Sequence, residues 1–207
     1  MISAYIEALL AELNMRRHQV HCADTIYFGG GTPSVLTHLQ IAQILEGIHT
    51  CFSVTPDAEI TLEVNPETVN QAALTAYREA GINRLNIGLQ SLDVATLKFL
   101  GRIHTADKGV DSYRWARVSG FDNIGVDLIY GVPGQTRSRW ETEMAGVVGL
   151  APDHLSCYTL TMEPGTPMAQ RVQNGQIQTL DEQTAGDLFS ATASYLNHHG
   201  YRQYEIS

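Results

Sequence analysis

The chain has 207 residues, 43% of them hydrophobic, and a formal net charge of -9 at pH 7. This length fits one domain or a large part of one, and the acidic balance argues against a nucleic-acid partner, which requires a basic surface. No apolar run approaches the roughly 18 residues of a membrane span and no secretory signal pattern is present. Three widely spaced cysteines favour a reducing compartment, so we predict a cytoplasmic location.

Helical and extended segments alternate along the chain. Apolar residues at helical spacing predict helices, and β-branched runs bounded by Gly, Pro or Asn predict strands. The predicted helices cover residues 2–17, 37–51, 69–80, 93–101, 105–119 and 136–150, a short stretch ending near Gly175, and 181–199. The predicted strands cover residues 25–28, 59–64, 84–91, 123–130, 154–160 and 201–206. This alternation predicts an α/β fold with a parallel sheet or barrel.

The stretch from Asp24 to Ser34 organises the rest of the chain. It begins with a short strand, Thr25–Phe28, that we expect to be buried, and three consecutive glycines follow. Glycine accepts φ > 0 and lets a ligand approach the main chain, while Pro33 stiffens the turn. A dinucleotide-binding loop would need glycine where Ser34 stands, so that interpretation is disfavoured. A tight turn without a ligand is the other interpretation of this stretch.

Polar or glycine residues close each of the first five predicted strands. The carboxyl ends of parallel strands lie at one face, where such folds bind ligands. Glu63 and Asp127 accept hydrogen bonds, and Gln90 both donates and accepts them. A solvated Glu63 and a structural salt bridge at Asp127 are the alternatives, and on composition alone Arg102 is a surface or capping residue. The histidines show no spacing typical of metal ligands.

Six stretches spread over nearly the whole chain form a pattern: Tyr27–Ser34 (YFGGGTPS), Glu63–Pro66 (EVNP), Asn86–Ser91 (NIGLQS), Leu100–His104 (LGRIH), Asp127–Gln135 (DLIYGVPGQ) and Arg202–Ile206 (RQYEI). Together they resemble the oxygen-independent coproporphyrinogen III oxidase-like radical SAM family. Within that family the residues of these motifs are most similar to those of the haem chaperone (HemW-type) branch. The resemblance implies a partial (β/α)6 radical SAM barrel that lacks its first strand, with residues 1–207 forming one incomplete barrel domain.

The resemblance also implies a cofactor pair. S-adenosylmethionine (SAM) would lie across the strand ends, and a [4Fe-4S] cluster chelated by its methionine end would reduce its sulfonium to a 5′-deoxyadenosyl radical. The residues that it assigns to SAM are Gly30, Gly31, Thr32, Glu63, Gln90, Arg102, Asp127 and Thr161. Arg102 would pair with the methionine carboxylate, because a guanidinium pairs well with an anion, and the main chain at Thr161 would contact the adenine.

The sequence departs from the family at the cluster. The family holds its cluster with Cys-x3-Cys-x2-Cys, and this sequence has only the isolated Cys22, Cys51 and Cys157. We therefore expect no metal ligand and no assignable catalytic residue in this chain, and we expect a fragment that lacks the cluster loop and a C-terminal domain.

Several functions follow from these residues. The resemblance implies the SAM-binding barrel portion of a haem chaperone with haem or porphyrin as partner, or of an oxygen-independent coproporphyrinogen III oxidative decarboxylase. A barrel enzyme that binds a phosphate ester on the glycine turn, and an inactive fragment, are the alternatives. A barrel without its first strand would leave a strand edge exposed, so we also predict self-association through that edge.

Overall fold

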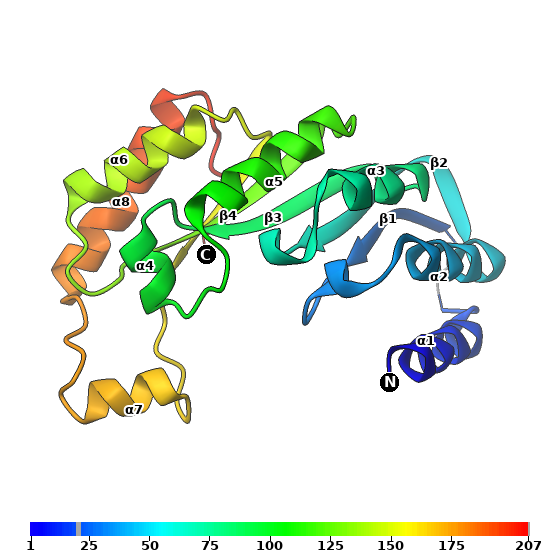
Figure 1. Cartoon of the computed structure of the whole chain (residues 1–207), viewed down its shortest axis with the longest axis horizontal. Coiled ribbons are helices and arrows are strands. Elements are labelled where there is room, and N and C mark those ends of the chain that lie inside the picture. The colour runs from blue at the N-terminus through cyan, green and yellow to red at the C-terminus, as the bar shows by residue number, and fades with distance from the viewer. Residues whose placement is uncertain (20–21, 207) are drawn as a thin grey trace. The chain divides into compact units, whose positions relative to one another are not determined.

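The computed structural model describes residues 1–19 and 22–206, in which helices and strands alternate (Figure 1). The strands are β1 (Cys22–Phe28), β2 (Ser53–Val64), β3 (Arg84–Gln90), β4 (Asn123–Tyr130) and β5 (His154–Thr159). The helices are α1 (Ile2–Arg16), α2 (His38–Cys51), α3 (Gln71–Glu79), α4 (Val94–Phe99), α5 (Ala106–Val118), α6 (Arg137–Val148), α7 (Pro167–Gln173) and α8 (Glu182–His198). Two 3-10 turns, η1 (Pro33–Val35) and η2 (Pro66–Thr68), follow β1 and β2.

The strands form one sheet in the order β1-β2-β3-β4-β5, and the pairs β1–β2, β2–β3 and β4–β5 are parallel. The predicted α/β class is therefore confirmed. Within the part of the chain that the structure describes, β1 pairs with β2 alone, so one edge of β1 carries no strand. Self-association through this edge stays a prediction.

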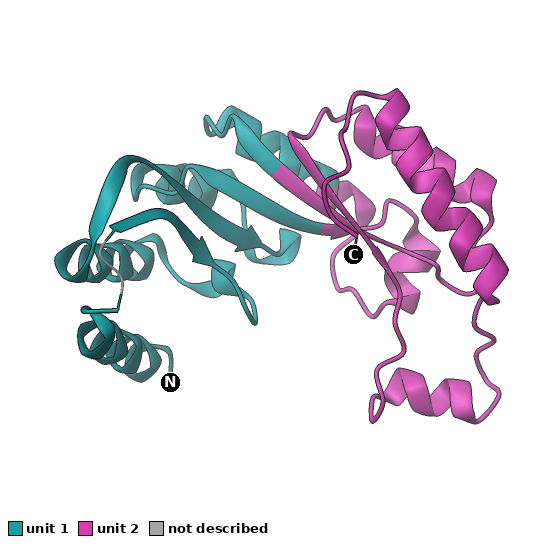
Figure 2. Ribbon diagram, turned by 180° about the vertical axis from the view of Figure 1, so that it is seen from behind, with its two compact units in different colours: residues 1–88, 110–124 teal, residues 89–109, 125–207 magenta. Residues whose placement is uncertain are grey.

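The chain divides into two compact units, coloured teal and magenta in Figure 2. Unit 1 comprises residues 1–88 and 110–124, and unit 2 comprises residues 89–109 and 125–207. The boundary passes through β3 and β4, which leaves the carboxyl ends of both strands in unit 2.

Unit 1 is built on β1, β2 and most of β3, with α2 and α3 supplying apolar side chains. The side chain of Thr37 caps α2 and Gln40 returns the bond, which confirms the capping box predicted by their spacing. Ile41, Leu62 and Leu74 are each 0% exposed, so these three elements share one apolar core. This core supports the strand ends that carry the glycine turn.

Unit 2 is centred on Trp140 of α6. Its ring stacks on Tyr130 of β4 with centroids 5.3 Å apart, and its Nε1 donates to Thr192 Oγ1 of α8 at 2.7 Å. Trp140 and Met144 of α6 are 0% exposed and Leu188 of α8 is 1% exposed. One tryptophan thus joins α6 and α8 to the sheet.

Two local predictions are wrong. Residues 201–206 form no strand, because side chains hold this segment instead of a backbone ladder: Tyr201 Oη donates to Pro152 O at 2.7 Å, and Tyr204 Oη lies 2.6 Å from His154 Nε2. The strand at residues 25–28 is not buried, since Ile26 alone among these four is classed as buried. With β1 at the edge of the sheet, its alternate side chains face solvent.

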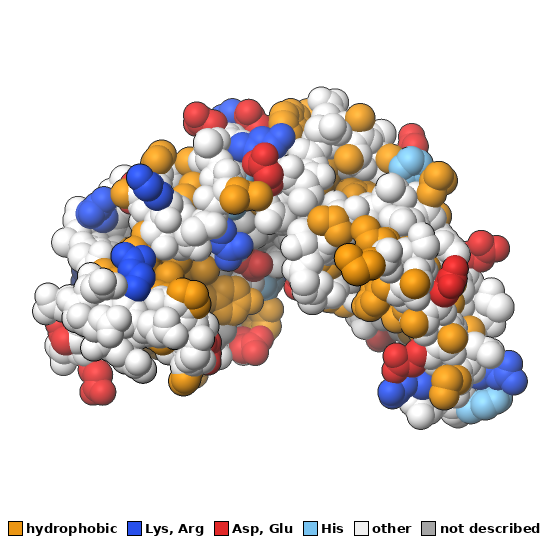
Figure 3. Space-filling model, turned by 60° about the horizontal axis from the view of Figure 1, so that its bottom comes forward, with side chains coloured by type: hydrophobic (Ala, Val, Ile, Leu, Met, Phe, Trp, Pro, Cys, Tyr) orange, Lys and Arg blue, Asp and Glu red, His pale blue; other side chains and the backbone are white. Residues whose placement is uncertain are grey.

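Apolar side chains also appear on the surface of both units, among charged ones (Figure 3). The large exposed ones include Tyr5, Met15, Val94, Ile103 and Ile206. Single exposed apolar residues are ordinary on protein surfaces, so none of them alone marks a binding surface. No helix in the described part of the chain is both long enough and apolar enough to cross a membrane.

Candidate SAM-binding site

The predicted site residues fall into two groups. Gly30, Gly31, Thr32 and Glu63 belong to unit 1, and Gln90, Arg102, Asp127 and Thr161 belong to unit 2. Within each unit the structure places them at or just after the carboxyl ends of strands. Arg102, which follows α4, and Asp127, which lies within β4 before its last three residues, are the exceptions.

The glycine turn after β1 presents bare backbone. Gly30 and Gly31 have φ of 76° and 57°, and a Cβ added at either would meet no atom within 4 Å. Other residues rarely adopt this left-handed conformation, so glycine is required here by the backbone conformation and not by steric crowding. The main chain here is open to a ligand.

Glu63 lies beside this turn. Its Oε1 accepts a hydrogen bond from Tyr27 Oη at 2.9 Å. A Cβ at Gly29 would come 2.7 Å from Tyr27 Cε1 and 3.2 Å from Glu63 Oε1. Gly29 is therefore needed for close approach, and the carboxylate of Glu63 is oriented by a neighbour instead of being free in solvent.

Ser34 joins the two strand ends of unit 1, a role that sequence reasoning missed. It is 2% exposed, and its Oγ accepts from Asn65 N at 3.0 Å and lies 2.7 Å from Thr68 Oγ1. Tyr77 Oη donates to the carbonyl of Ser34 at 3.0 Å and to that of Leu36 at 2.6 Å. These bonds fix the chain after the glycine turn to the chain after β2.

In unit 2, Gln90 ends β3 with its side chain 7% exposed. Asp127, in β4, is half-buried and acts electrostatically on Arg102 and Cys157. Partial enclosure lowers the pKa of the exposed Arg102 guanidinium, and the negative charge of Asp127 opposes that shift. The unit thus brings an acidic and a basic predicted site residue into one electrostatic neighbourhood.

Cys157 of β5 adds to that neighbourhood. Burial, and after it the charge of Asp127, raises the pKa of the Cys157 thiol to about 12. The thiol therefore stays protonated at neutral pH and is a poor nucleophile or metal ligand. Thr161 lies past the end of β5, exposed and outside any helix or strand, and nothing around it tests the role predicted for its main chain.

Sequence reasoning also missed two buried residues of unit 2. His104, assigned to a loop without a partner, is 3% exposed, and the carbonyl of Leu89 accepts a bond from its Nε2 at 3.1 Å. Glu143 of α6 is 8% exposed and contacts the residues that follow Gln90. The sequence shows no local signal for either contact.

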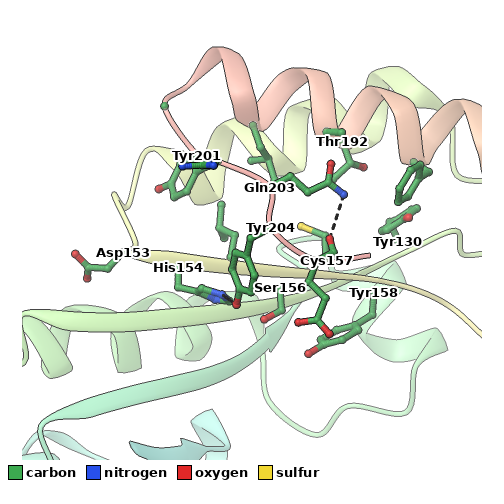
Figure 4. A pocket seen from close by; sticks show the side chains of 17 residues that line it. Tyr130, Asp153, His154, Ser156, Cys157, Tyr158, Thr192, Tyr201, Gln203 and Tyr204 are labelled. Atoms are coloured by element: carbon green, nitrogen blue, oxygen red, sulfur yellow. Dashed lines mark hydrogen bonds between the residues drawn. The ribbon is translucent and has the colours of Figure 1, made fainter. Parts of the chain in front are cut away.

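A cavity of about 440 Å³ lies elsewhere in unit 2, between β5, α8 and the segment after α8 (Figure 4). Its walls include His154, Cys157, Thr192 and Tyr204, and none of the predicted site residues. Among the lining residues, the imidazole of His154 and the hydroxyl of Tyr204 lie next to each other, 2.6 Å apart (Figure 4). The cavity therefore contains no predicted site residue, although its wall includes Tyr130, the last residue of β4, and Cys157, on which Asp127 acts.

The described residues do not fit an iron–sulfur cluster. Cys22 and Cys51 belong to unit 1 and Cys157 to unit 2. No group of three or more His, Cys, Asp or Glu side chains in the described part of the chain is arranged to hold a metal ion. Unit 1 by itself offers a ligand an open glycine backbone and the positioned carboxylate of Glu63. Unit 2 by itself offers the Arg102–Asp127 neighbourhood, and both sets are of the kind that pairs with polar ligand groups such as those of SAM.

Comparison with known proteins identifies the family. The radical SAM superfamily model matches residues 4–144, a span that contains every predicted SAM residue except Thr161. The chain belongs to the radical SAM superfamily. Family membership implies SAM and a [4Fe-4S] cluster in the family, as the resemblance did.

Individual relatives share about a third of their residues with this chain. This radical SAM chain is 32% identical over 206 residues to "Heme chaperone HemW" of Synechocystis sp., covering 100% of the chain and 50% of that protein. It is 35% identical over 197 residues to "Radical S-adenosyl methionine domain-containing protein 1, mitochondrial" of Bos taurus, covering 95% of the chain and 45% of that protein. The chain spans about half the length of the curated relatives it matches.

A solved structure has the same fold as this chain. Coproporphyrinogen III oxidase (HemN) from Escherichia coli superposes with a TM-score of 0.84 at 29% identity, over 97% of this chain and 46% of that one. The fold class predicted from the sequence, a partial radical SAM barrel, is confirmed. The predicted cytoplasmic location is not confirmed, because the relatives include a protein named as mitochondrial.

Proposed function

We propose that this chain is the SAM-binding barrel portion of a haem chaperone of the coproporphyrinogen oxidase-like radical SAM family. The observation that carries the proposal is the family match over residues 4–144, which includes the glycine turn and the carboxylates at Glu63 and Asp127. The chaperone is preferred to the oxidase because proteins named heme chaperone HemW match the chain at 32% identity over its whole length.

In this proposal the eight residues hold SAM by its polar groups. The backbone of Gly30, Gly31 and Thr32 binds the methionine end, and Arg102 pairs with the methionine carboxylate. Glu63 and Asp127 accept hydrogen bonds from amino or hydroxyl groups, and the amide of Gln90 donates or accepts. SAM supplies the sulfonium centre on which the family's chemistry depends, and the chain's own residues bind and orient it. The main chain at Thr161 contacts the adenine.

Isothermal titration with SAM and with S-adenosylhomocysteine tests this binding. We expect saturable heat with both ligands, and loss of it in a Glu63→Ala, Asp127→Ala double variant. Heat with phosphate esters but none with SAM at millimolar concentration would favour the phosphate-binding alternative instead. Pro33 opens η1 and has no N–H to offer a phosphate there, which speaks against that alternative. An absence of both heats would favour the inactive fragment.

Haem titration of the full-length gene product separates the chaperone from the oxidase. We expect tight haem uptake, followed by absorbance, without decarboxylation of coproporphyrinogen III. Conversion of coproporphyrinogen III to protoporphyrinogen IX would instead assign the oxidative decarboxylase. Light scattering of this chain against concentration tests self-association through the free edge of β1.

A further inference from the structure

Gln90 ends β3 in a strained turn. Its φ is 67°, uncommon for a residue with a Cβ, and Ser91 N donates to Leu89 O at 2.9 Å across it. A bond between residues i and i+2 around a central residue of positive φ is a γ-turn of the rare, strained kind. Such a conformation persists only when the surrounding structure holds it.

The carboxylate of Glu143 supplies that support. Its Oε1 accepts from Ser91 Oγ, from Leu92 N at 3.0 Å and from Asp93 N at 3.2 Å, and Ser91 Oγ shares the Asp93 N–H at 2.9 Å. Three donors from the residues directly after Gln90 therefore converge on one oxygen. On the other side of the turn, the carbonyl of Leu89 also accepts from His104 Nε2 at 3.1 Å.

The second oxygen of Glu143 reaches the loop after β4. Gln135 Nε2 donates to Glu143 Oε2 at 3.4 Å, and Gln135 Oε1 accepts from Gly131 N at 2.7 Å. The second bond fixes which end of the Gln135 amide faces Glu143. One buried carboxylate thus connects the end of the strand that carries Gln90 to the loop that follows the strand of Asp127.

Packing holds α6, the helix of Glu143, against this turn. A Cβ added at Gly146 would come 2.7 Å from Leu92 Cδ1, so the helix and the loop are in close contact. Trp140 and Met144 on the same helix are 0% exposed. Arg139 Nη2 also contacts Asp93 Oδ2, at 3.4 Å. The packed helix α6 therefore holds the carboxylate of Glu143 against the loop.

We propose that Glu143 is a positioning residue for SAM binding, which acts by holding Gln90 in its γ-turn at the end of β3. This inference rests on the proposed SAM-binding function and adds to it a residue outside the strand ends and outside the motifs. Glu143 touches no ligand in this account. It fixes the backbone from which the amide of Gln90 is presented.

The variant that tests this is Glu143→Gln, which keeps the size of the side chain. An amide oxygen is a weaker acceptor for three converging donors, and its NH2 would face the NH2 of Gln135. The matched control is Glu141→Gln, the same change on the same helix, where the side chain only pairs with Arg137 at 2.7 Å on the surface. We expect SAM to bind about tenfold more weakly to Glu143→Gln and unchanged to Glu141→Gln.

A measurement in the absence of SAM tests the effect on the turn separately from the effect on SAM affinity. Amide hydrogen exchange at Leu92 should accelerate in Glu143→Gln, and exchange at Asp93 should accelerate less because Asp93 N keeps Ser91 Oγ as an acceptor. Both rates should stay as in the wild type in Glu141→Gln. A double-mutant cycle with Gln90→Ala then tests the route. If Glu143 acts through Gln90, Glu143→Gln causes no further loss of SAM affinity once Gln90 is removed.

Three results would overturn the proposal: unchanged exchange at Leu92 and Asp93, unchanged SAM affinity despite faster exchange, or additive losses in the cycle. If the wild-type chain binds no SAM, the proposed function itself is rejected. This outcome is distinct from the three above, because it is seen before any residue is substituted. Should Glu143→Gln fail to fold, Ser91→Ala removes the hydroxyl that donates to Glu143 Oε1 and accepts from Asp93 N at 2.9 Å. Exchange is then read at Leu92 alone, and the same measurements apply with an expected loss of SAM affinity of about threefold.

Discussion

The strand ends of unit 1 and unit 2 carry predicted SAM residues in two different ways. In unit 1 the site is open backbone: Gly30 and Gly31 are exposed and no atom lies within 4 Å of a Cβ added there. In unit 2 it consists of side chains in a partly buried, charged neighbourhood, where Gln90 is 7% exposed and Asp127 shifts the pKa values of Arg102 and Cys157. The first kind of site is selected by backbone conformation, and the second by partners that are distant in sequence.

Thiol labelling tests this difference most strongly. Because the pKa of Cys157 is raised to about 12, we expect its reaction with iodoacetamide at pH 8 to be roughly a thousandfold slower than that of a free cysteine. Cys22 of unit 1 is exposed and should label readily. The rate at Cys157 should rise about tenfold per pH unit from 8 to 11, since the thiolate fraction grows in that proportion.

The same shift has a consequence for stability. The unfolded chain releases the Cys157 proton near the usual thiol pKa, whereas the folded chain keeps it until about pH 12, so folding stability falls as pH rises between these values. Cys157→Ser should remove that part of the pH dependence. Labelling of Cys157 as fast as Cys22, measured by peptide mass spectrometry, would show that unit 2 is as open as unit 1.

Removing the carboxylates gives the next largest effect. We expect Asp127→Ala and Glu63→Ala each to weaken SAM binding in the intact protein by about 1–3 kcal/mol, the usual penalty for leaving a buried partner unsatisfied. That range corresponds to about 5–150-fold in the dissociation constant from titration calorimetry. Asp127→Ala should lie toward the upper end because it also removes the charge that Arg102 faces.

Glu67→Ala is the matched control, an exposed carboxylate in η2 after the same strand as Glu63. It should leave the dissociation constant unchanged. Unchanged constants in both Glu63→Ala and Asp127→Ala would remove the site assignment in the two units together.

Much of the fold could be predicted from the sequence, because local signals determine where elements begin and end. Thr37 and Gln40 at capping-box spacing specify the start of α2, and the structure contains both bonds. Local pattern failed at residues 201–206, whose extended composition resembles a strand while Tyr201 and Tyr204 are held by side-chain contacts. It also predicted a buried strand at residues 25–28, whereas β1 lies at the edge of the sheet, a property of topology that only the family resemblance indicated.

The candidate site divides in the same way. Glycines and polar residues at strand ends are visible in the sequence, because parallel strands bring their carboxyl ends to one face. Ser34, His104 and Glu143 are not visible, since each acts through a partner far along the chain; Ser91 and Glu143 are separated by 52 residues. Supporting contacts of this kind require the tertiary structure.

Glycine substitutions sharpen the comparison within unit 1. Gly31→Ala places a Cβ at φ 57°, and we expect a loss of about 1–2 kcal/mol in the free energy of unfolding from backbone strain. Gly29→Ala should destabilise for another reason, because its Cβ would lie 2.7 Å from Tyr27 Cε1. Chemical denaturation measures both.

A second substitution separates the two causes. Tyr27→Ala removes the ring that Gly29→Ala would strike, and should therefore relieve that variant. It should leave Gly31→Ala as destabilised as before. Relief of both would mean that the Gly31 position is limited by space and not by conformation.

The smallest expected effect concerns the hydroxyl of Tyr27. Tyr27→Phe keeps the ring and removes the hydroxyl that donates to Glu63 Oε1 at 2.9 Å, in a residue that is 54% exposed. Water can replace a partner at such a site, so we expect about 0.5 kcal/mol, or roughly two- to threefold weaker SAM binding, with unfolding unchanged. A loss as large as that of Glu63→Ala would mean that the hydroxyl contacts the ligand directly. An unchanged affinity would mean that Glu63 binds SAM without orientation by Tyr27.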